Sequence, residues 1–64
     1  MNQEVLKRVA ESVGPVLYLR ALANLCRAGF MNKSTKYKYE RAMRKALGMS
    51  YEELLVAKSR SYRV

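Results

Sequence analysis

The stretch Leu47-Gly48-Met49-Ser50-Tyr51-Glu52-Glu53-Leu54 (residues 47–54) combines a signal that ends one helix with a signal that begins the next. Gly48 suits the left-handed backbone position that follows the last turn of a helix. Ser50 is a favoured N-cap residue, and Glu53, three residues later, completes the pattern of a capping box. We therefore predict two helices joined by a very short connection at Leu47–Ser50, an αα-hairpin or helix-turn-helix-like corner.

The predicted helix before this corner, residues 35–47, has two chemically different sides. Asn32, Ser34 or Thr35 can cap its start. The residues that recur on its apolar side are Tyr39, Ala42, Met43, Ala46 and Leu47. The residues on the opposite side are Tyr37, Lys38, Arg41, Arg44 and Lys45, and in this positive run Glu40 is the only acidic residue. We expect a core to hold the first side while the second presents cations.

Three further helices are predicted over residues 3–13, 15–28 and 51–60. In the first, the apolar residues Val5, Leu6, Val9, Ala10 and Val13 recur at helical spacing. The second is apolar around most of its circumference, which is typical of a central helix or of a homodimer interface. Phe30 is expected to fold back onto its last turn. In the last helix we expect Tyr51, Leu54, Leu55 and Tyr62 to face inward, and the basic end, residues 58–64, to fray.

These elements predict an all-α protein, with residues 1–64 forming one compact bundle of three to four short helices. The start of the chain lacks the pattern of a signal peptide. The most apolar run, Val16–Cys26, is interrupted by Arg20 and is far shorter than the roughly 20 residues that cross a bilayer, so a membrane partner is not expected. Cys26 has no second cysteine to pair with, which favours a reducing, cytoplasmic setting.

The inventory of reactive side chains predicts that this protein is not an enzyme. Histidine is absent, so the usual general base and the commonest metal ligand are missing. A single cysteine without histidine makes neither a zinc site nor a Cys-His nucleophile pair. The three glycines stand at predicted helix ends and form no phosphate-binding loop. We therefore expect no cofactor and no metal.

The charge of the chain predicts a polyanionic partner. Thirteen Lys and Arg residues against five Glu give a formal net charge of +8. Cations on one helix can neutralise phosphates and release condensed counterions, and an exposed tyrosine can contact a phosphate or stack on a base. We therefore predict binding of DNA or RNA. The predicted contacts are Lys33, Lys36, Tyr37, Lys38, Arg41, Arg44, Lys45, Arg60 and Arg63.

Residues 40–59 resemble a bacterial helix-turn-helix, since Met43 and Leu47 are apolar, Gly48 makes the turn and Leu54 follows on the inner side. The stretch departs from that pattern at Arg44, where a small residue normally lets the two helices approach. It departs again at Glu52 and Glu53, whose charge would repel DNA phosphates from the second helix. The chain is therefore not assigned to that family, and helix 35–47 is the preferred binding element.

An alternative function is that of a protein-binding adaptor or inhibitor that docks on an acidic surface of a larger complex. Short chains without enzyme chemistry are typical of viral and mobile-element products that modulate host machinery. The basic side would then steer association, and an apolar anchor would supply most of the affinity. The candidate anchors are Phe30, Met31 and Tyr51.

Overall fold

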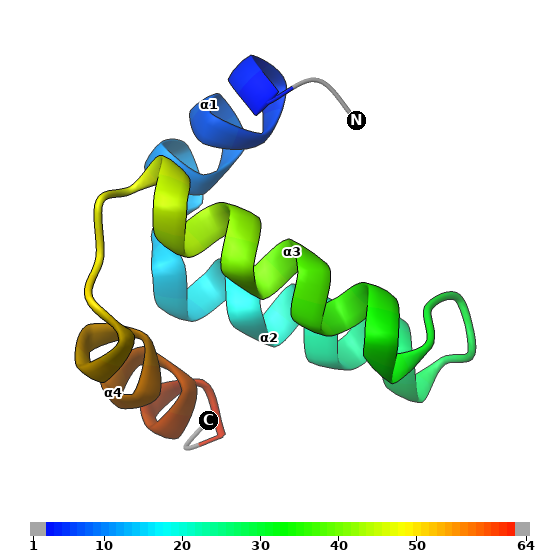
Figure 1. Ribbon diagram of the computed structural model, residues 1–64. Coiled ribbons are helices and arrows are strands. Elements are labelled where there is room, and N and C mark those ends of the chain that lie inside the picture. The colour runs from blue at the N-terminus through cyan, green and yellow to red at the C-terminus, as the bar shows by residue number, and fades with distance from the viewer. Residues whose placement is uncertain (1–2, 63–64) are drawn as a thin grey trace.

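The computed structural model describes residues 3–62, which form four α-helices (Figure 1). They are α1 (Gln3–Val13), α2 (Pro15–Arg27), α3 (Lys33–Ala46) and α4 (Tyr51–Ser61). No strand occurs within these residues, and they extend over 27 × 26 × 19 Å. The prediction of a small all-α bundle is confirmed.

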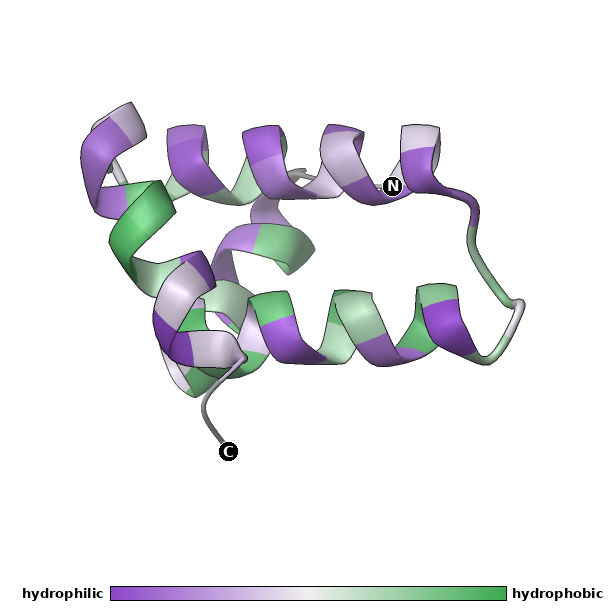
Figure 2. Ribbon diagram, turned by 90° about the horizontal axis from the view of Figure 1, so that it is seen from below, coloured by the Kyte–Doolittle hydropathy of each residue, from purple (hydrophilic) through white to green (hydrophobic). Residues whose placement is uncertain are grey.

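Two helices, α2 and α3, lie side by side and run in opposite directions (Figures 1 and 2). The loop between them closes one end of this pair, at the right of both views. At the other end, α1 packs above the pair and α4 below it, as Figure 1 is drawn. Helix α1 contacts both α2 and α3, whereas α4 packs chiefly on α2. The side of α4 that adjoins α3 is therefore only loosely covered.

Helix α3 begins two residues earlier than predicted because Asn32 is its N-cap. The Asn32 side chain accepts a hydrogen bond from the backbone N–H of Thr35, at 2.8 Å. This bond satisfies one of the free amide groups at the helix start, so Lys33 and Ser34 join the first turn. Helix α2 ends at Arg27, one residue before the predicted end.

The corner between α3 and α4 has the capping geometry predicted for it. The Ser50 hydroxyl accepts from the N–H of Glu53 at 3.1 Å, and the Glu53 carboxylate accepts from the N–H of Ser50 at 2.9 Å. Gly48 has φ 65°, and the N–H of Met49 bonds to the carbonyl of Arg44 at 2.9 Å. These local bonds end α3 and start α4 within four residues.

The core is built from one small group of side chains on each helix. Met43 of α3 lies at its centre with 0% of its surface exposed. The apolar side predicted for α3 is confirmed, because Tyr39, Ala42, Ala46 and Leu47 pack against this core. The buried apolar residues are Leu6, Ala10, Tyr18, Leu19, Leu22, Met43, Leu54 and Ala57.

The inward orientation predicted for α4 is wrong for three of its four residues. Leu54 is buried, but Tyr51, Leu55 and Tyr62 are exposed. Because α4 packs chiefly on α2, it buries the narrow strip of Leu54 and Ala57. The apolar residues of α4 lie on several sides of the helix, so their periodicity alone does not predict which side packs on α2.

Neighbouring helices also cover only part of the apolar surface of α1 and α2. Leu6 and Ala10 of α1 are buried, whereas Val5, Val9 and Val13 beside them are about half exposed. Tyr18, Leu19 and Leu22 of α2 enter the core, whereas Leu17 and Leu25 remain exposed. A chain of this length has too few helices to cover both sides of each.

Two expectations about chain ends and loops are corrected. Residues 58–61 continue α4 instead of fraying, and the Ser61 hydroxyl donates to the carbonyl of Lys58 at 2.7 Å. Residues 63 and 64 lie outside the described residues. The N–H of Phe30 does fold back onto the carbonyl of Leu25, at 3.0 Å, but the Phe30 side chain stays exposed.

Candidate nucleic-acid interface

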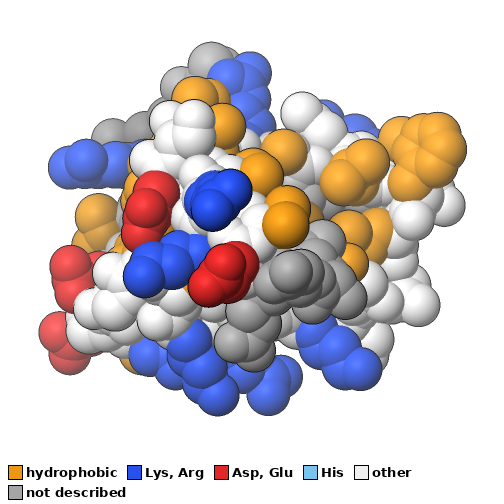
Figure 3. All heavy atoms as spheres, turned by 90° about the horizontal axis from the view of Figure 1, so that it is seen from above, with side chains coloured by type: hydrophobic (Ala, Val, Ile, Leu, Met, Phe, Trp, Pro, Cys, Tyr) orange, Lys and Arg blue, Asp and Glu red, His pale blue; other side chains and the backbone are white. Residues whose placement is uncertain are grey.

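One side of α3 presents an exposed row of cations, which we call the basic side. It consists of Lys38, Arg41 and Lys45, to which we add Lys33 at the first position of the helix; all four are exposed. Residues 38, 41 and 45 are three and four positions apart and therefore neighbour one another on the helix. Figure 3 shows several Lys and Arg side chains along the lower edge of the view, which is the α3 side of the molecule, and others at its centre, top and upper left. None of the four has a carboxylate partner among residues 3–62.

Lys36 lies on the other side of α3, away from this row. Its ammonium is 3.9 Å from the carboxylate of Glu40, and its side chain is only 14% exposed. Glu40 is itself buried, and its other carboxylate oxygen lies 3.0 Å from the ammonium of Lys58 on α4. The structure therefore separates Lys36 from the other predicted contacts of α3 and places it in a partly buried ion-pair cluster.

Arg44 is partly buried, and its guanidinium is engaged by the backbone. Its Nη1 donates to the carbonyl oxygen of Met49 at 3.2 Å, across the corner between α3 and α4. In the helix-turn-helix pattern a small residue occupies this position, whereas here the long side chain bonds to the connecting loop. Arg44 thus combines a predicted phosphate contact with a role in holding the corner.

Two ammonium groups lie close to the ring of Tyr37. The Nζ atoms of Lys36 and Lys58 stand 5.4 Å and 5.3 Å from the centre of its ring, within the range of cation–π attraction. Burial opposes the charged form of Lys58, but its hydrogen bond to Glu40 and the charge of that carboxylate outweigh burial, so the pKa of Lys58 is raised. Lys58 therefore stays protonated beside the ring at neutral pH.

A groove of about 310 Å³ separates α3 from α4. We call it the α3–α4 groove. Its lining residues are Tyr37, Glu40, Arg41, Arg44, Tyr51, Leu54, Leu55 and Lys58. Sequence reasoning missed Lys58 and Leu55 as site residues, and it considered Tyr51 only as an anchor for a protein partner. The sequence signal for this groove is the spacing of its lining residues, since each helix contributes residues i, i+3, i+4 and i+7, which lie on one side of a helix.

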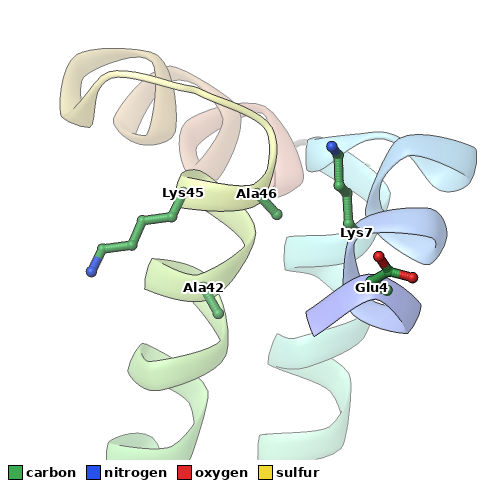
Figure 4. A pocket seen from close by; sticks show the side chains of 5 residues that line it. All are labelled: Glu4, Lys7, Ala42, Lys45 and Ala46. Atoms are coloured by element: carbon green, nitrogen blue, oxygen red, sulfur yellow. The ribbon is translucent and has the colours of Figure 1, made fainter. Parts of the chain in front are cut away.

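A second hollow, of about 350 Å³, lies between α1 and α3 (Figure 4). Ala42 and Ala46 line it on the α3 side, and Glu4 and Lys7 line it on the α1 side. Lys45 also lines it, but Figure 4 shows that the side chains of Lys7 and Lys45 point in different directions. These two ammonium groups do not converge on one position, so this hollow is not a built anion site.

Of the two predicted contacts near the end of the chain, only Arg60 is described, and it does not join the basic side. Arg60 is exposed, but it lines a hollow beside Pro15 together with Glu52 and Glu53. Phosphate binding there would be opposed by the two carboxylates. Arg63 lies outside the described residues.

The three anchors predicted for a protein partner are separated in the fold. Phe30 is 81% exposed and lies in the α2–α3 loop, whereas Met31 beside it packs against the core. Tyr51 begins α4, at the opposite end of the α2–α3 pair from that loop (Figure 1). Figure 3 shows hydrophobic side chains reaching the surface toward the loop end of the molecule. Phe30 and Tyr51 therefore belong to two different surfaces.

Comparison of the chain with protein-family models, curated proteins and solved structures finds no match in any of the three. Among residues 3–62, no helix is long and apolar enough to span a membrane. Within the same residues, no three carboxylate, thiol or imidazole groups come together as a set of metal ligands.

Proposed function

We propose that this protein binds nucleic acid through the basic side of α3. The observation that carries the proposal is that Lys33, Lys38, Arg41 and Lys45 are exposed on one helix and have no carboxylate partner among the described residues. Because these cations are unpaired, they can neutralise phosphates without first breaking an ion pair. Each phosphate contact also releases condensed counterions. The opposite side of α3 is anchored by Met43, so the row is held on a rigid element.

The exposed row is a narrower set than the nine residues predicted from the sequence. Lys36 is already neutralised by Glu40, so its release to a phosphate would leave a buried carboxylate less well paired. Arg44 would have to share its guanidinium with the carbonyl of Met49. The proposal therefore assigns the main phosphate contacts to the exposed row and a secondary one to Arg44.

The proposal is tested with two double variants of equal charge. Lys38→Gln with Arg41→Gln and Arg8→Gln with Arg27→Gln each lower the formal net charge of +8 by two. Arg8 and Arg27 are exposed on α1 and α2. We expect the α3 variant to weaken oligonucleotide binding at least tenfold and the control to weaken it about twofold, measured by fluorescence anisotropy. Equal losses would mean that net charge alone attracts the polymer, with no site on α3.

A second candidate function, docking on an acidic protein surface, is favoured by the exposure of Phe30. A phenylalanine that exposes 81% of its surface is a natural anchor for a protein partner. Recovery of the native complex with and without nuclease separates the two functions. A partner that survives nuclease and is lost in Phe30→Ala supports docking, whereas loss of the partner after nuclease supports nucleic-acid binding.

Binding rather than catalysis, and a reducing cytoplasmic setting, are parts of the same proposal. The first is supported by the absence of histidine from the sequence, and the second by the presence of one cysteine, Cys26, without a second to pair with.

A further inference from the structure

The α3–α4 groove has a regular construction along two neighbouring helices. Its α3 wall is built from residues 37, 40, 41 and 44, and its α4 wall from residues 51, 54, 55 and 58. At about 1.5 Å per residue, each wall extends for about 10 Å. Two buried side chains, Glu40 and Leu54, lie at the bottom of these walls. The groove is thus a short channel and not an isolated pit.

Its electrostatic character is positive in spite of the carboxylate at its base. Glu40 is 4% exposed and is paired with Lys58 at 3.0 Å and with Lys36 at 3.9 Å. The lining also contains the guanidinium groups of Arg41 and Arg44. The cations therefore outnumber the single carboxylate, and an anionic ligand can enter without meeting an unpaired negative charge.

Tyr51 is the more exposed of the two aromatic rings that line the groove. It is 64% exposed, and it stands at the first position of α4 beside the half-exposed Leu55. Tyr37 on the opposite wall is 45% exposed, and the ammonium groups of Lys36 and Lys58 already lie over its ring. A planar group that enters the groove would therefore stack on Tyr51 and contact Leu55.

We propose that the α3–α4 groove receives unpaired bases of single-stranded nucleic acid, an inference that rests on the proposed function. Arg41 links the two surfaces, because it lines the groove and also belongs to the basic side. The phosphate backbone follows Lys38, Arg41 and Lys45, and the bases turn into the groove toward Tyr51. At about 3.4 Å per nucleotide, a groove of about 10 Å accepts about three stacked bases. Aromatic rings beside a cationic track are the general means of binding single strands without sequence preference.

An acidic amphipathic helix fits the same groove less well. A helix that binds in a groove buries an apolar stripe against aliphatic and aromatic surface. Among the lining residues, Leu54 is already buried and Leu55 is the one aliphatic side chain that is exposed. The remaining exposed lining is cationic or tyrosine, which matches phosphates and bases better than it matches leucine side chains.

The test compares single-stranded oligothymidine and oligouridine of about 12 nucleotides with a DNA duplex of the same length. Four proteins are measured by fluorescence anisotropy: the wild type, Tyr51→Ala, Tyr51→Phe and Tyr62→Ala. Tyr62 is the matched control, since it is the C-cap residue of α4 and is 65% exposed but does not line the groove. Circular dichroism verifies that each variant keeps its helices. Comparison of the two single strands shows whether DNA or RNA is preferred.

We expect Tyr51→Ala to weaken single-strand binding about tenfold and duplex binding less than twofold. Tyr51→Phe, which keeps the ring, and Tyr62→Ala should both bind single strands as the wild type does. If Tyr51→Ala and Tyr62→Ala behave alike, or if the duplex binds as tightly as the single strands, the groove is not a base site. The proposed function survives that result provided that Lys38→Gln with Arg41→Gln still weakens binding.

Two further outcomes overturn more of the proposal. Displacement of the wild type from oligothymidine by an acidic amphipathic helical peptide, with loss of peptide binding in Tyr51→Ala, would assign the groove to a protein. Failure of the wild type to bind any of the three oligonucleotides would reject both the groove site and the proposed function.

Discussion

The ammonium of Lys58 lies 3.0 Å from the buried carboxylate of Glu40 and joins α4 to α3 at the base of the groove between them. These two helices otherwise make few contacts, because α4 packs chiefly on α2. The ion pair therefore fixes the spacing of the groove walls and neutralises the carboxylate that would repel an anion. It also places Lys58 against the ring of Tyr37.

Loss of the Glu40 charge should lower stability by about 1–2 kcal/mol. Breaking a fully buried pair typically costs about 3–5 kcal/mol and breaking an exposed pair less than about 1 kcal/mol. Here Glu40 is buried, but the side chain of Lys58 is 25% exposed and can reach water. Urea unfolding of Glu40→Gln measures the effect. The control is Glu11→Gln, whose exposed pair with Lys7 at 4.0 Å should contribute less than about 0.5 kcal/mol. Equal losses in both variants would contradict a structural role for the buried pair.

The capping box makes Ser50→Ala destabilising by about 1 kcal/mol. The substitution removes the acceptor for the N–H of Glu53 and leaves an amide group at the start of α4 without its partner. Ser59→Ala is the control, since Ser59 is exposed on the same helix and its hydroxyl takes part in no hydrogen bond among the described residues. Thermal unfolding should show a lower Tm for the first variant only. A normal Tm for Ser50→Ala would mean that the cap contributes nothing to folding.

Acid should remove the contribution of Glu53. Hydrogen bonds from the backbone and side chain of Ser50 lower the pKa of the Glu53 carboxyl below its ordinary value of 4.5. Because the folded state holds this proton less tightly than the unfolded state, ionisation of Glu53 stabilises the fold. The contribution is complete above the ordinary pKa and is lost as the pH falls through the lowered one.

The measurement is the difference in Tm between the wild type and Glu53→Gln as a function of pH. This difference should be constant near neutral pH and should shrink below about pH 4.5. Glu52→Gln is the control, because Glu52 stands in the same first turn but forms no capping bond. A Glu52→Gln difference with the same pH profile would assign the effect to the helix dipole instead of the cap.

Met43→Ala should destabilise the protein by about 2–5 kcal/mol, because it opens a cavity at the centre of the core. A domain of 64 residues has a total stability of about 3–10 kcal/mol, so this loss is a large part of the total and should lower the Tm sharply. Phe30→Ala removes a larger side chain but from the surface, and should change stability by less than about 0.5 kcal/mol. Far-ultraviolet circular dichroism distinguishes the two. A stable Met43→Ala variant would contradict the packing of α3 described above.

The logarithm of the oligonucleotide binding constant should fall linearly with the logarithm of salt concentration, and Lys38→Gln should reduce the slope by about one. The reason is that one fewer phosphate contact releases about one fewer counterion. Arg27→Gln removes an exposed cation from α2 and should leave the slope unchanged. Titrations at several salt concentrations provide both slopes. An unchanged slope in Lys38→Gln would remove that lysine from the interface.

Local signals predicted much of this fold. The capping box of Ser50 and Glu53, the apolar side of α3 around Met43 and the existence of four helices follow from residues within one or two turns of each other. Boundaries were less accurate where several caps were available, as at Asn32, because the sequence offers three acceptors and the backbone uses one.

The candidate site was predicted in part. Lys38, Arg41 and Lys45 are exposed on one side of α3, as the helical spacing indicates, and the predicted contact Lys33 is exposed at the first position of the helix. Lys36 was grouped with them, although its position on the helix places it beside Glu40. Lys58 was treated as part of a fraying end, and its contact with α3 was not foreseen, since no local pattern relates residue 58 to residue 40.

The amino-acid sequence alone determined where helices form and that α3 has one apolar and one cationic side, because caps and periodicity act between neighbouring residues. Only the tertiary structure decided that α4 turns Leu54 inward and Tyr51 outward, and that Lys58 reaches Glu40. The physical reason is that burial depends on which surface of another helix arrives to cover a side chain. In a bundle with only four short helices, many apolar side chains compete for that cover and several remain exposed.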